Sequence, residues 1–381
     1  MSLTVFLVTR NHEQSLPLAL RSAAGLADEV LVADTGSTDR TAAVAAELGA
    51  RVVPCEWDDD FAAACNFALD QATGDWLLLL NPDEEVRDPG RERLREAMGR
   101  TDALAYFVTV EDQLRADQPD VVAETVQLRL FRRHPGLRYV GRLHPHFAEP
   151  PEEVARREGK QVLVAPLTLR RHGYLSTVTP DKLRWARRLL ERELQDRPGQ
   201  LHYLIEYGHT LLQLNDPRGH AVMAEAADQV LAARDAPAAP DASVGPLLEY
   251  LLTVSPEQSR SRVTRAEAEE LVRRWFPHSP PLLWRLAEAA FQGQDFRRAA
   301  GYLAALVGMG ETGRYDRSLG FDPGIISDTA RMNLGVACLR SGDLATAEQC
   351  FRRLLQSPRH AEGAAKNLGV IERLRQQRGM G

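Results

Sequence analysis

The chain has 381 residues, of which 44% are hydrophobic and 26% are charged, and its formal net charge is −6. This composition is typical of a soluble globular protein with two domains, and the acidic balance argues against general nucleic-acid binding. The four cysteines form no CxxC pair, which argues against a zinc site and against a disulfide framework. The cysteine usage fits a reduced, cytoplasmic setting, and we expect neither a leader peptide at the N-terminus nor an apolar stretch long enough to span a bilayer.

Strands and helices alternate along the first part of the chain. The β-rich runs are predicted strands at residues 3–8, 28–34, 51–54 and 76–80, and the alanine- and leucine-rich runs between them are predicted helices at 16–24, 42–48 and 61–72. A strand–helix alternation at this spacing indicates βαβ units and a mostly parallel sheet. The first domain is therefore predicted to be α/β.

The stretch Trp76–Glu85 is the centre of this domain. Four leucines after a tryptophan predict a strand that is buried on both faces, and Pro82 stops it because proline cannot donate to a ladder. Asp83, Glu84 and Glu85 then follow the strand at its carboxyl end, where open α/β sheets bind ligands. Their carboxylates suit a divalent metal that in turn binds phosphates. The alternative is a polar turn that begins a helix.

Polar residues also follow the other predicted strands. They are Thr9 and Asn11, then Asp34 and Ser37, and then residues 58–60. If the strands are parallel, these clusters meet in one crevice of the size of a nucleotide. The chain lacks the GxGxxG pattern of a dinucleotide-binding fold, which argues against a dehydrogenase.

Several motifs resemble family 2 glycosyltransferases in order and content. They are Val8–Asn11 with Glu13, the block Val32–Thr41, Glu56–Trp57 with Asp60–Phe61, Asn66–Phe67 and Ala72–Trp76. The resemblance implies a GT-A fold for residues 1–178, a nucleotide-diphosphate sugar as donor and an inverting transfer. It also implies donor binding by Thr9, Asn11, Glu13, Asp34, Ser37, Asp39, Asp60, Asn81, Arg129, Arg132 and His144. Arg170 and Arg171 are further candidates to neutralise the diphosphate.

The resemblance implies a divalent metal, Mn²⁺ or Mg²⁺, held by Asp83 as the last acid of the family's Asp-any-Asp motif. His172, in a His-Gly-Tyr segment similar to the family's, is the second candidate ligand. The first acid of the motif is replaced by Asn81, which carries no charge, so metal binding is expected to be weakened or lost.

Two further positions depart from the family's pattern. Cys65 stands where an arginine is frequent, and we interpret it as a buried small hydrophobe rather than a nucleophile. Pro145 follows His144 where the family has a glutamate, and a proline cannot accept a proton. The candidates for the catalytic base are therefore His146, whose unperturbed pKa suits this role, and the pair Asp112 and Glu111.

Residues 179–381 change to leucine, alanine, arginine and glutamate with helical periodicity. Two segments, starting at Leu286 and Leu334, share small residues and an Asp-aromatic or Asp-leucine pair at the same spacing, and they resemble tetratricopeptide repeats. The alternative is an irregular helical bundle. Such arrays bind a protein partner or a second copy of the chain.

Two functional hypotheses lead, ahead of a third, a structural assembly module that binds no nucleotide. The first is a glycosyltransferase that moves a sugar from a nucleotide-diphosphate donor to a glycan, lipid-linked or peptide acceptor. The second is a catalytically degenerate transferase-like domain in a repeat-based binding or scaffold protein, favoured by the departures at Cys65, Asn81 and Pro145. The sequence leaves the sugar, the nucleobase and the acceptor open.

Overall fold

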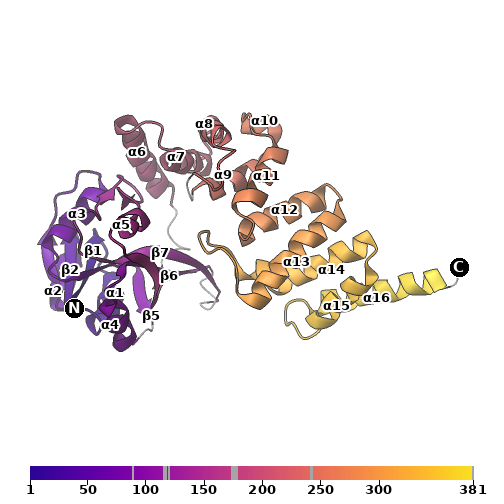
Figure 1. The fold of residues 1–381 in the computed structure, drawn as a ribbon, viewed down its shortest axis with the longest axis horizontal. Helices are drawn as coiled ribbons and strands as arrows, with labels where there is room; N and C mark the ends of the chain where they lie inside the picture. The colour runs from indigo at the N-terminus through magenta and orange to yellow at the C-terminus, as the bar shows by residue number, and fades with distance from the viewer. Residues whose placement is uncertain (88–89, 115–117, 119–120, 173–178, 241–242, 380–381) are drawn as a thin grey trace. The chain divides into compact units, whose positions relative to one another are not determined.

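The computed structural model describes residues 1–87, 90–114, 118, 121–172, 179–240 and 243–379. The chain divides into two compact units, Met1–Tyr203 and Leu204–Gly381 (Figure 1). The predicted domain boundary after residue 178 adjoins residues 173–178, which lie outside the described part, and it stays a prediction. Helix α6 (Pro180–Asp196) is grouped with the first unit.

An eight-stranded mixed sheet forms the centre of the first unit, in the order β3-β2-β1-β4-β7-β6-β10-β5. Its strands are β1 (Leu3–Thr9), β2 (Glu29–Asp34), β3 (Arg51–Pro54), β4 (Trp76–Leu79), β5 (Glu84–Arg87), β6 (Ala103–Gln113), β7 (Val122–Arg132) and β10 (Gln161–Arg171). Strands β1 to β4 are parallel, and β7 is antiparallel to both β4 and β6. Strand β10 is parallel to β6 and antiparallel to β5. The carboxyl ends of β1 to β4, β6 and β10 therefore lie along one edge.

Helices cover both faces of this sheet, so that the unit has three layers. Buried side chains of α1 (Leu16–Ala24), α2 (Thr41–Glu47) and α4 (Arg91–Gly99) pack on one face, and those of α3 (Phe61–Gln71) and α5 (Pro151–Arg157) pack on the other. The leucine run behaves as predicted for a central strand, because Leu77 and Leu78 point to opposite faces and are 2% and 0% exposed. A separate two-stranded sheet of β8 (Tyr139–Val140) and β9 (His146–Phe147) packs on Phe131 of β7.

The acids after the leucine run begin a strand. Glu84 and Glu85 open β5, which pairs with β10 so that Arg171 is opposite Glu84. The alternative of a helix start is therefore wrong. The alternation of inward and outward side chains on β5 lets Glu84 be buried against Arg171 of the adjacent strand β10 and Arg129 of β7.

The second unit is all helical. Its helices are α7 (Leu201–Gln213, which begins in the first unit), α8 (Arg218–Ala232), α9 (Val244–Thr253), α10 (Pro256–Ser259), α11 (Arg265–Trp275), α12 (Pro280–Gln292), α13 (Phe296–Thr312), α14 (Asp328–Ser341), α15 (Leu344–Leu354) and α16 (Ala361–Gly379), with a 3₁₀ turn η2 (Pro323–Ile326). The predicted architecture, an α/β domain with a mostly parallel sheet followed by a helical domain, is confirmed. Among the described residues, no helix is long and apolar enough to cross a membrane.

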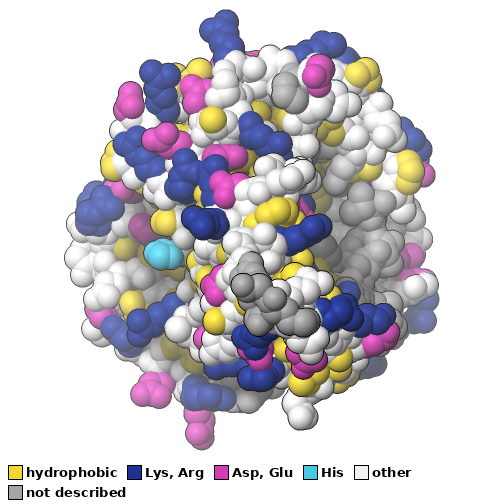
Figure 2. All heavy atoms as spheres, turned by 90° about the vertical axis from the view of Figure 1, so that its right-hand side faces the viewer, with side chains coloured by type: hydrophobic (Ala, Val, Ile, Leu, Met, Phe, Trp, Pro, Cys, Tyr) yellow, Lys and Arg dark blue, Asp and Glu magenta, His cyan; other side chains and the backbone are white. Residues whose placement is uncertain are grey.

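The internal repeat is visible in the pairs α12–α13 and α14–α15. Asp295 and Asp343 occupy the same position in the two pairs, and each carboxylate caps the following helix by accepting a backbone N–H, from Arg298 and Thr346. Gly335 packs against Phe351, which is fully buried. Small residues thus allow close helix packing, as predicted for tetratricopeptide-like repeats. On the face drawn in Figure 2, basic, acidic and hydrophobic side chains are interspersed.

Candidate functional site

A cleft of about 930 Å³ opens at the carboxyl edge of the sheet, within the first unit. We call it the strand-end cleft. Its lining includes Asp83 after β4, Arg129 on β7, Arg171 at the end of β10, and both His144 and His146. Lys182 and Trp185 of α6 line it as well. The position agrees with the rule that open α/β sheets bind ligands where the strand order reverses, here at β1, which has β2 on one side and β4 on the other.

Glu84 is a buried carboxylate that holds two arginine side chains at the wall of this cleft. Its carboxylate is 0% exposed and accepts hydrogen bonds from Arg171 Nη2 at 2.8 Å and from Arg129 Nη2 at 3.3 Å. The backbone N–H and the amide Nδ2 of Asn81 donate to it at 2.9 and 2.8 Å. Burial acts to raise the pKa of Glu84, but the two guanidinium charges and the hydrogen bonds outweigh burial and lower it. Sequence reasoning did not identify this role, because nothing local distinguishes Glu84 from Asp83 and Glu85.

The two predicted metal ligands are adjacent through the backbone, since the His172 N–H donates to the Asp83 carbonyl at 3.1 Å. Their side chains differ in environment. Asp83 lines the strand-end cleft, whereas His172 Nε2 lies 2.6 Å from Glu85 Oε2. Within the described ranges, no group of three or more His, Cys, Asp or Glu side chains is arranged to hold a metal. The arrangement fits a divalent ion that takes one carboxylate, Asp83, and completes its shell with substrate phosphates and water, as Mg²⁺ commonly does. Gly173 and Tyr174 of the His-Gly-Tyr segment lie outside the described residues.

Six of the predicted donor-binding residues meet in the two loops that follow β1 and β2. The loops are joined mainly by side chains that accept backbone N–H groups: Asn11 Oδ1 from Thr38, Glu13 Oε2 from Arg40, and Asp39 Oδ2 from Glu13. Asp34 accepts from the Ser37 N–H, Ser37 Oγ accepts from the Asn11 N–H, and the Thr9 carbonyl accepts from Thr35. Asn11 adopts a φ of 57° to make this turn. The structure brings this group together in a network that fixes the shape of the two loops, and donor binding by these residues stays a prediction.

Two further predicted donor-binding residues have local structural roles. Asp60 caps α3 by accepting the Ala63 N–H at 2.9 Å. Arg132 lies toward the opposite end of the sheet, because it pairs with Trp76 at the start of β4. Its guanidinium donates to the carbonyls of Ala103 and Arg100. The structure therefore does not bring Arg132 to the strand-end cleft, whereas Arg129, three residues earlier on β7, lines it.

The three candidate bases differ in their partners and in their position relative to the cleft. Glu111 is bound by Arg170, with Nη2 at 2.6 Å, and Asp112 is bound by Arg171 Nη1 at 2.9 Å. Burial raises the pKa of Asp112, and Arg171 opposes this only in part. His146 is the one among the three that lines the cleft, with Nδ1 at 3.3 Å from Tyr203 Oη. Cys65 is 4% exposed, and burial raises its pKa to about 12, which agrees with its interpretation as a buried small hydrophobe.

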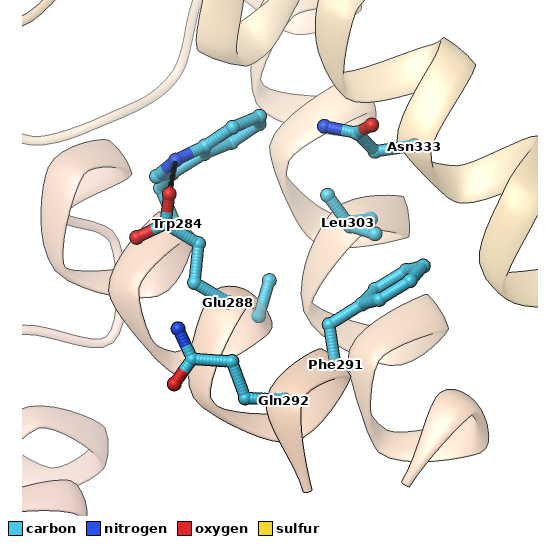
Figure 3. Close-up of a pocket in the computed structure, with 7 residues that line it drawn as sticks. Trp284, Glu288, Phe291, Gln292, Leu303 and Asn333 are labelled. Carbon is cyan, nitrogen blue, oxygen red and sulfur yellow. Dashed lines mark hydrogen bonds between the residues drawn. The ribbon is translucent and has the colours of Figure 1, made fainter. Parts of the chain in front are cut away.

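A second, smaller hollow of about 340 Å³ lies in the helical unit. Figure 3 shows side chains that line it, which are Trp284, Glu288, Phe291 and Gln292 of α12, Leu303 of α13 and Asn333 of α14. The Trp284 indole N–H donates to Glu288 at 2.8 Å. The hollow combines aromatic rings, side-chain amides and one carboxylate, that of Glu288.

Comparison with known proteins finds a family match within the first unit. Residues 4–157 match the model of glycosyl transferase family 2. The chain is 33% identical to a TPR repeat-containing protein of Synechococcus elongatus over 217 residues, which is 55% of this chain and 52% of that protein. It is 29% identical to an uncharacterized glycosyltransferase of Rickettsia typhi over 119 residues, 30% of this chain and 40% of that protein. The alignments thus span about half the length of these relatives or less.

Among solved structures, the chain is similar to glucosyl-3-phosphoglycerate synthase from Mycobacterium tuberculosis, described in complex with Mn²⁺, uridine diphosphate and phosphoglyceric acid. The identity is 18%, the TM-score is 0.35, and the match covers 51% of this chain and 78% of the other. Mannosyl-3-phosphoglycerate synthase from Rubrobacter xylanophilus matches with 17% identity and a TM-score of 0.34, over 51% of this chain and 74% of the other. The family match covers residues 4–157, which include all but the first residue of β1, the sheet strands β2 to β7 and the loops after β1, β2 and β4.

Proposed function

We propose that the chain is a glycosyltransferase that moves a sugar, with inversion, from a nucleotide-diphosphate donor to a hydroxyl or other nucleophile of an acceptor. The observation that carries this proposal is the strand-end cleft, which combines Asp83, Arg129 and His146 in a domain of family 2. A carboxylate for a metal, a cation for a leaving diphosphate and an imidazole for proton transfer are the groups that this reaction needs.

The nucleotide would lie against the loops after β1 and β2, whose hydrogen-bond network gives them a fixed shape. Asp34 and Asn11 are the side chains proposed to contact it. The diphosphate would lie toward Arg129 and Arg171, which Glu84 holds at the wall of the cleft. A divalent ion on Asp83, when bound, would neutralise charge on the departing diphosphate.

In the transfer step, the acceptor oxygen attacks the anomeric carbon while the bond from this carbon to the diphosphate oxygen breaks. The proton of the acceptor passes to His146 Nε2, and the negative charge leaves with the nucleotide diphosphate. We favour His146 over Asp112 and Glu111, because both carboxylates are engaged by arginines whereas His146 lines the cleft. The protonated imidazole returns its proton to solvent at the exposed rim.

A second candidate function is a binding or scaffold protein with a degenerate transferase domain. The amide of Asn81 is directed to Glu84, and Pro145 occupies the position at which the family resemblance predicts a glutamate. The hollow between α12, α13 and α14 offers this class of protein a partner surface. Under this proposal the helical unit binds a protein or a second copy of the chain.

Titration calorimetry separates the two. UDP-glucose and GDP-mannose are each titrated into the full chain, with and without Mn²⁺, and release of UDP or GDP is followed in the same samples. The transferase proposal expects binding of one donor and its slow hydrolysis. Absence of binding by both donors, and by UDP and GDP alone, would refute it. Tight binding with no turnover in any mixture would support the degenerate domain.

A further inference from the structure

Residues 141–146, which we call the histidine loop, carry His144 and His146 into the strand-end cleft. One side of the loop is tied to the start of α3. The backbone N–H groups of Phe61 and Ala62 donate to the carbonyls of Arg142 and Gly141 at 3.0 and 3.3 Å. This attachment lies within the segment that matches family 2.

The other side of the histidine loop is tied to helix α6, which follows that segment. Glu193 is 0% exposed, and its Oε2 accepts the backbone N–H of Arg142 at 2.9 Å. Asp196, one turn later, accepts Arg142 Nη2 at 2.7 Å. Helix α6 is itself held on the transferase domain, because Trp185 packs on the rings of Trp57 and Phe61 at 6.5 and 5.7 Å between centroids.

Tyr203, in the first turn of α7, contacts the histidine loop at both ends. Its side chain is 0% exposed, and its hydroxyl lies 3.3 Å from His146 Nδ1. At the other end, Gly141 has a φ of +105°, and a Cβ built on it would overlap the Tyr203 hydroxyl. A buried, two-sided packing of this kind leaves the hydroxyl little freedom to turn away from the imidazole.

We propose that Glu193 and Tyr203 are positioning residues for His146, so that the catalytic unit extends beyond the family-matched segment into α6 and the start of α7. Glu193 fixes the backbone of the histidine loop. A His146 that takes a proton on Nε2 must carry its own proton on Nδ1, and in that tautomer Nδ1–H donates to the Tyr203 hydroxyl across the 3.3 Å contact. This inference rests on the proposed function for its consequence, because only the Nε2 lone pair can take the proton of the acceptor.

The tautomer of His146 is the decisive observable. In ¹⁵N-labelled full-length protein, the imidazole nitrogens of His146 are assigned by their loss in His146→Gln and compared with those in Tyr203→Phe. We expect wild-type His146 in the Nδ1–H form, and a shift toward the Nε2–H form in Tyr203→Phe. Tyr250→Phe is the matched control, because it removes the 2.7 Å contact of Tyr250 with His220 Nδ1 in the helical unit and should leave His146 unchanged. An unchanged His146 tautomer in Tyr203→Phe overturns the proposal.

Activity gives the second readout. Loss of the hydrogen bond should slow hydrolysis of UDP-glucose or GDP-mannose, whichever is bound, by roughly 2- to 10-fold in kcat with little change in KM. Glu193→Ala should displace the His146 signals, whereas Glu193→Gln, which keeps an oxygen for the Arg142 N–H, should largely restore them. Lack of donor binding by the wild type would refute the proposed transferase, and the tautomer measurement would still decide the roles of Tyr203 and Glu193.

Discussion

Glu84 and Arg171 are 87 residues apart in the chain, and their side chains meet at 2.8 Å where β5 pairs with β10. This contact joins the turn after the central strand β4 to the last strand of the sheet. Asp83 is next to Glu84 in the turn, and its carbonyl accepts the backbone N–H of His172, the residue after Arg171. The candidate metal ligand is thus held in place by its neighbour's ion pair and by a backbone bond to the same strand end.

Removing the Glu84 carboxylate should destabilise the first unit strongly. Arg129 is 7% exposed, and Glu84→Ala leaves its charge without this partner, which typically costs about 3–5 kcal/mol for a buried pair. Urea unfolding of the full chain measures the difference. Glu85→Ala, which removes an adjacent, less buried carboxylate paired with Arg87 and His172, should cost at most about 1 kcal/mol. Equal losses in the free energy of unfolding for the two variants would show that the buried carboxylate of Glu84 stabilises the fold no more than that of Glu85.

Asp83→Asn tests the metal separately from the fold. We expect UDP to lose its dependence on Mn²⁺ in calorimetry, since an amide is a poor substitute for a carboxylate on a hard cation. The melting temperature should hardly change. Glu152→Gln is the control, because Glu152 is a second carboxylate among the described residues that line the strand-end cleft. If Asp83→Asn binds UDP with the same response to Mn²⁺ as the wild type, Asp83 does not hold the ion.

The parts of the fold that depend on short-range pattern could be predicted from the sequence. The leucine run, the strand–helix alternation and the polar strand ends placed β1 to β4 and their loops correctly, because parallel strands bring their carboxyl ends to one edge. The partners of individual charged side chains could not be predicted. Arg129 and Arg132 lie on one strand and look alike in the sequence, yet only the register of β7 decides that Arg129 reaches the cleft.

The helical contribution to the site was also beyond prediction. Trp185, Glu193 and Tyr203 occur in a region whose periodicity indicates helices, and nothing in that periodicity indicates which helix packs on the sheet domain. Their contacts with Phe61, Arg142 and His146 span many residues of sequence. Long-range pairings of this kind require the tertiary structure.

Lowering the pH should reduce the stability of the first unit, because it protonates Glu29. Burial acts to raise the pKa of Glu29, but hydrogen bonds from Thr4, Thr73 and Arg51 outweigh it and lower the pKa from 4.5 to about 2. Because the folded pKa is below the unfolded one, this stabilisation is complete above about pH 4.5 and is lost as the pH falls toward 2. Glu29→Gln should therefore be less stable than wild type at pH 7, and the difference should shrink in acid.

The pH dependence is measured by urea unfolding between pH 7 and pH 3. Glu47→Gln is the control, because Glu47 is 61% exposed and pairs only with the exposed Arg40 in the contacts described. A stability difference for Glu29→Gln that is the same at every pH would contradict the assignment to its ionised form.

Gly141→Ala should cost more stability than Gly49→Ala. Both glycines have positive φ, +105° and +84°, so alanine is strained at each by about 1–3 kcal/mol. At Gly49 nothing lies within 4 Å of the added Cβ, whereas at Gly141 the Cβ overlaps the Tyr203 hydroxyl. We expect Tyr203→Phe to recover part of the loss in a Gly141→Ala background, which a double-mutant cycle in urea measures. Additive changes in the free energy of unfolding would show that the added Cβ at residue 141 does not clash with the Tyr203 hydroxyl.

Two helical glycines test the repeat packing in the second unit. An added Cβ at Gly335 of α14 would lie 2.6 Å from the buried ring of Phe351, whereas at Gly301 of α13 nothing lies within 4 Å. Alanine favours a helix over glycine by about 0.5–1 kcal/mol, so Gly301→Ala should stabilise the unit by about this amount. At Gly335 overpacking, typically about 1–3 kcal/mol, should exceed that gain and lower the unfolding midpoint. Thermal unfolding followed by circular dichroism should therefore shift in opposite directions, and a stabilised Gly335→Ala would contradict the close approach of α14 and α15.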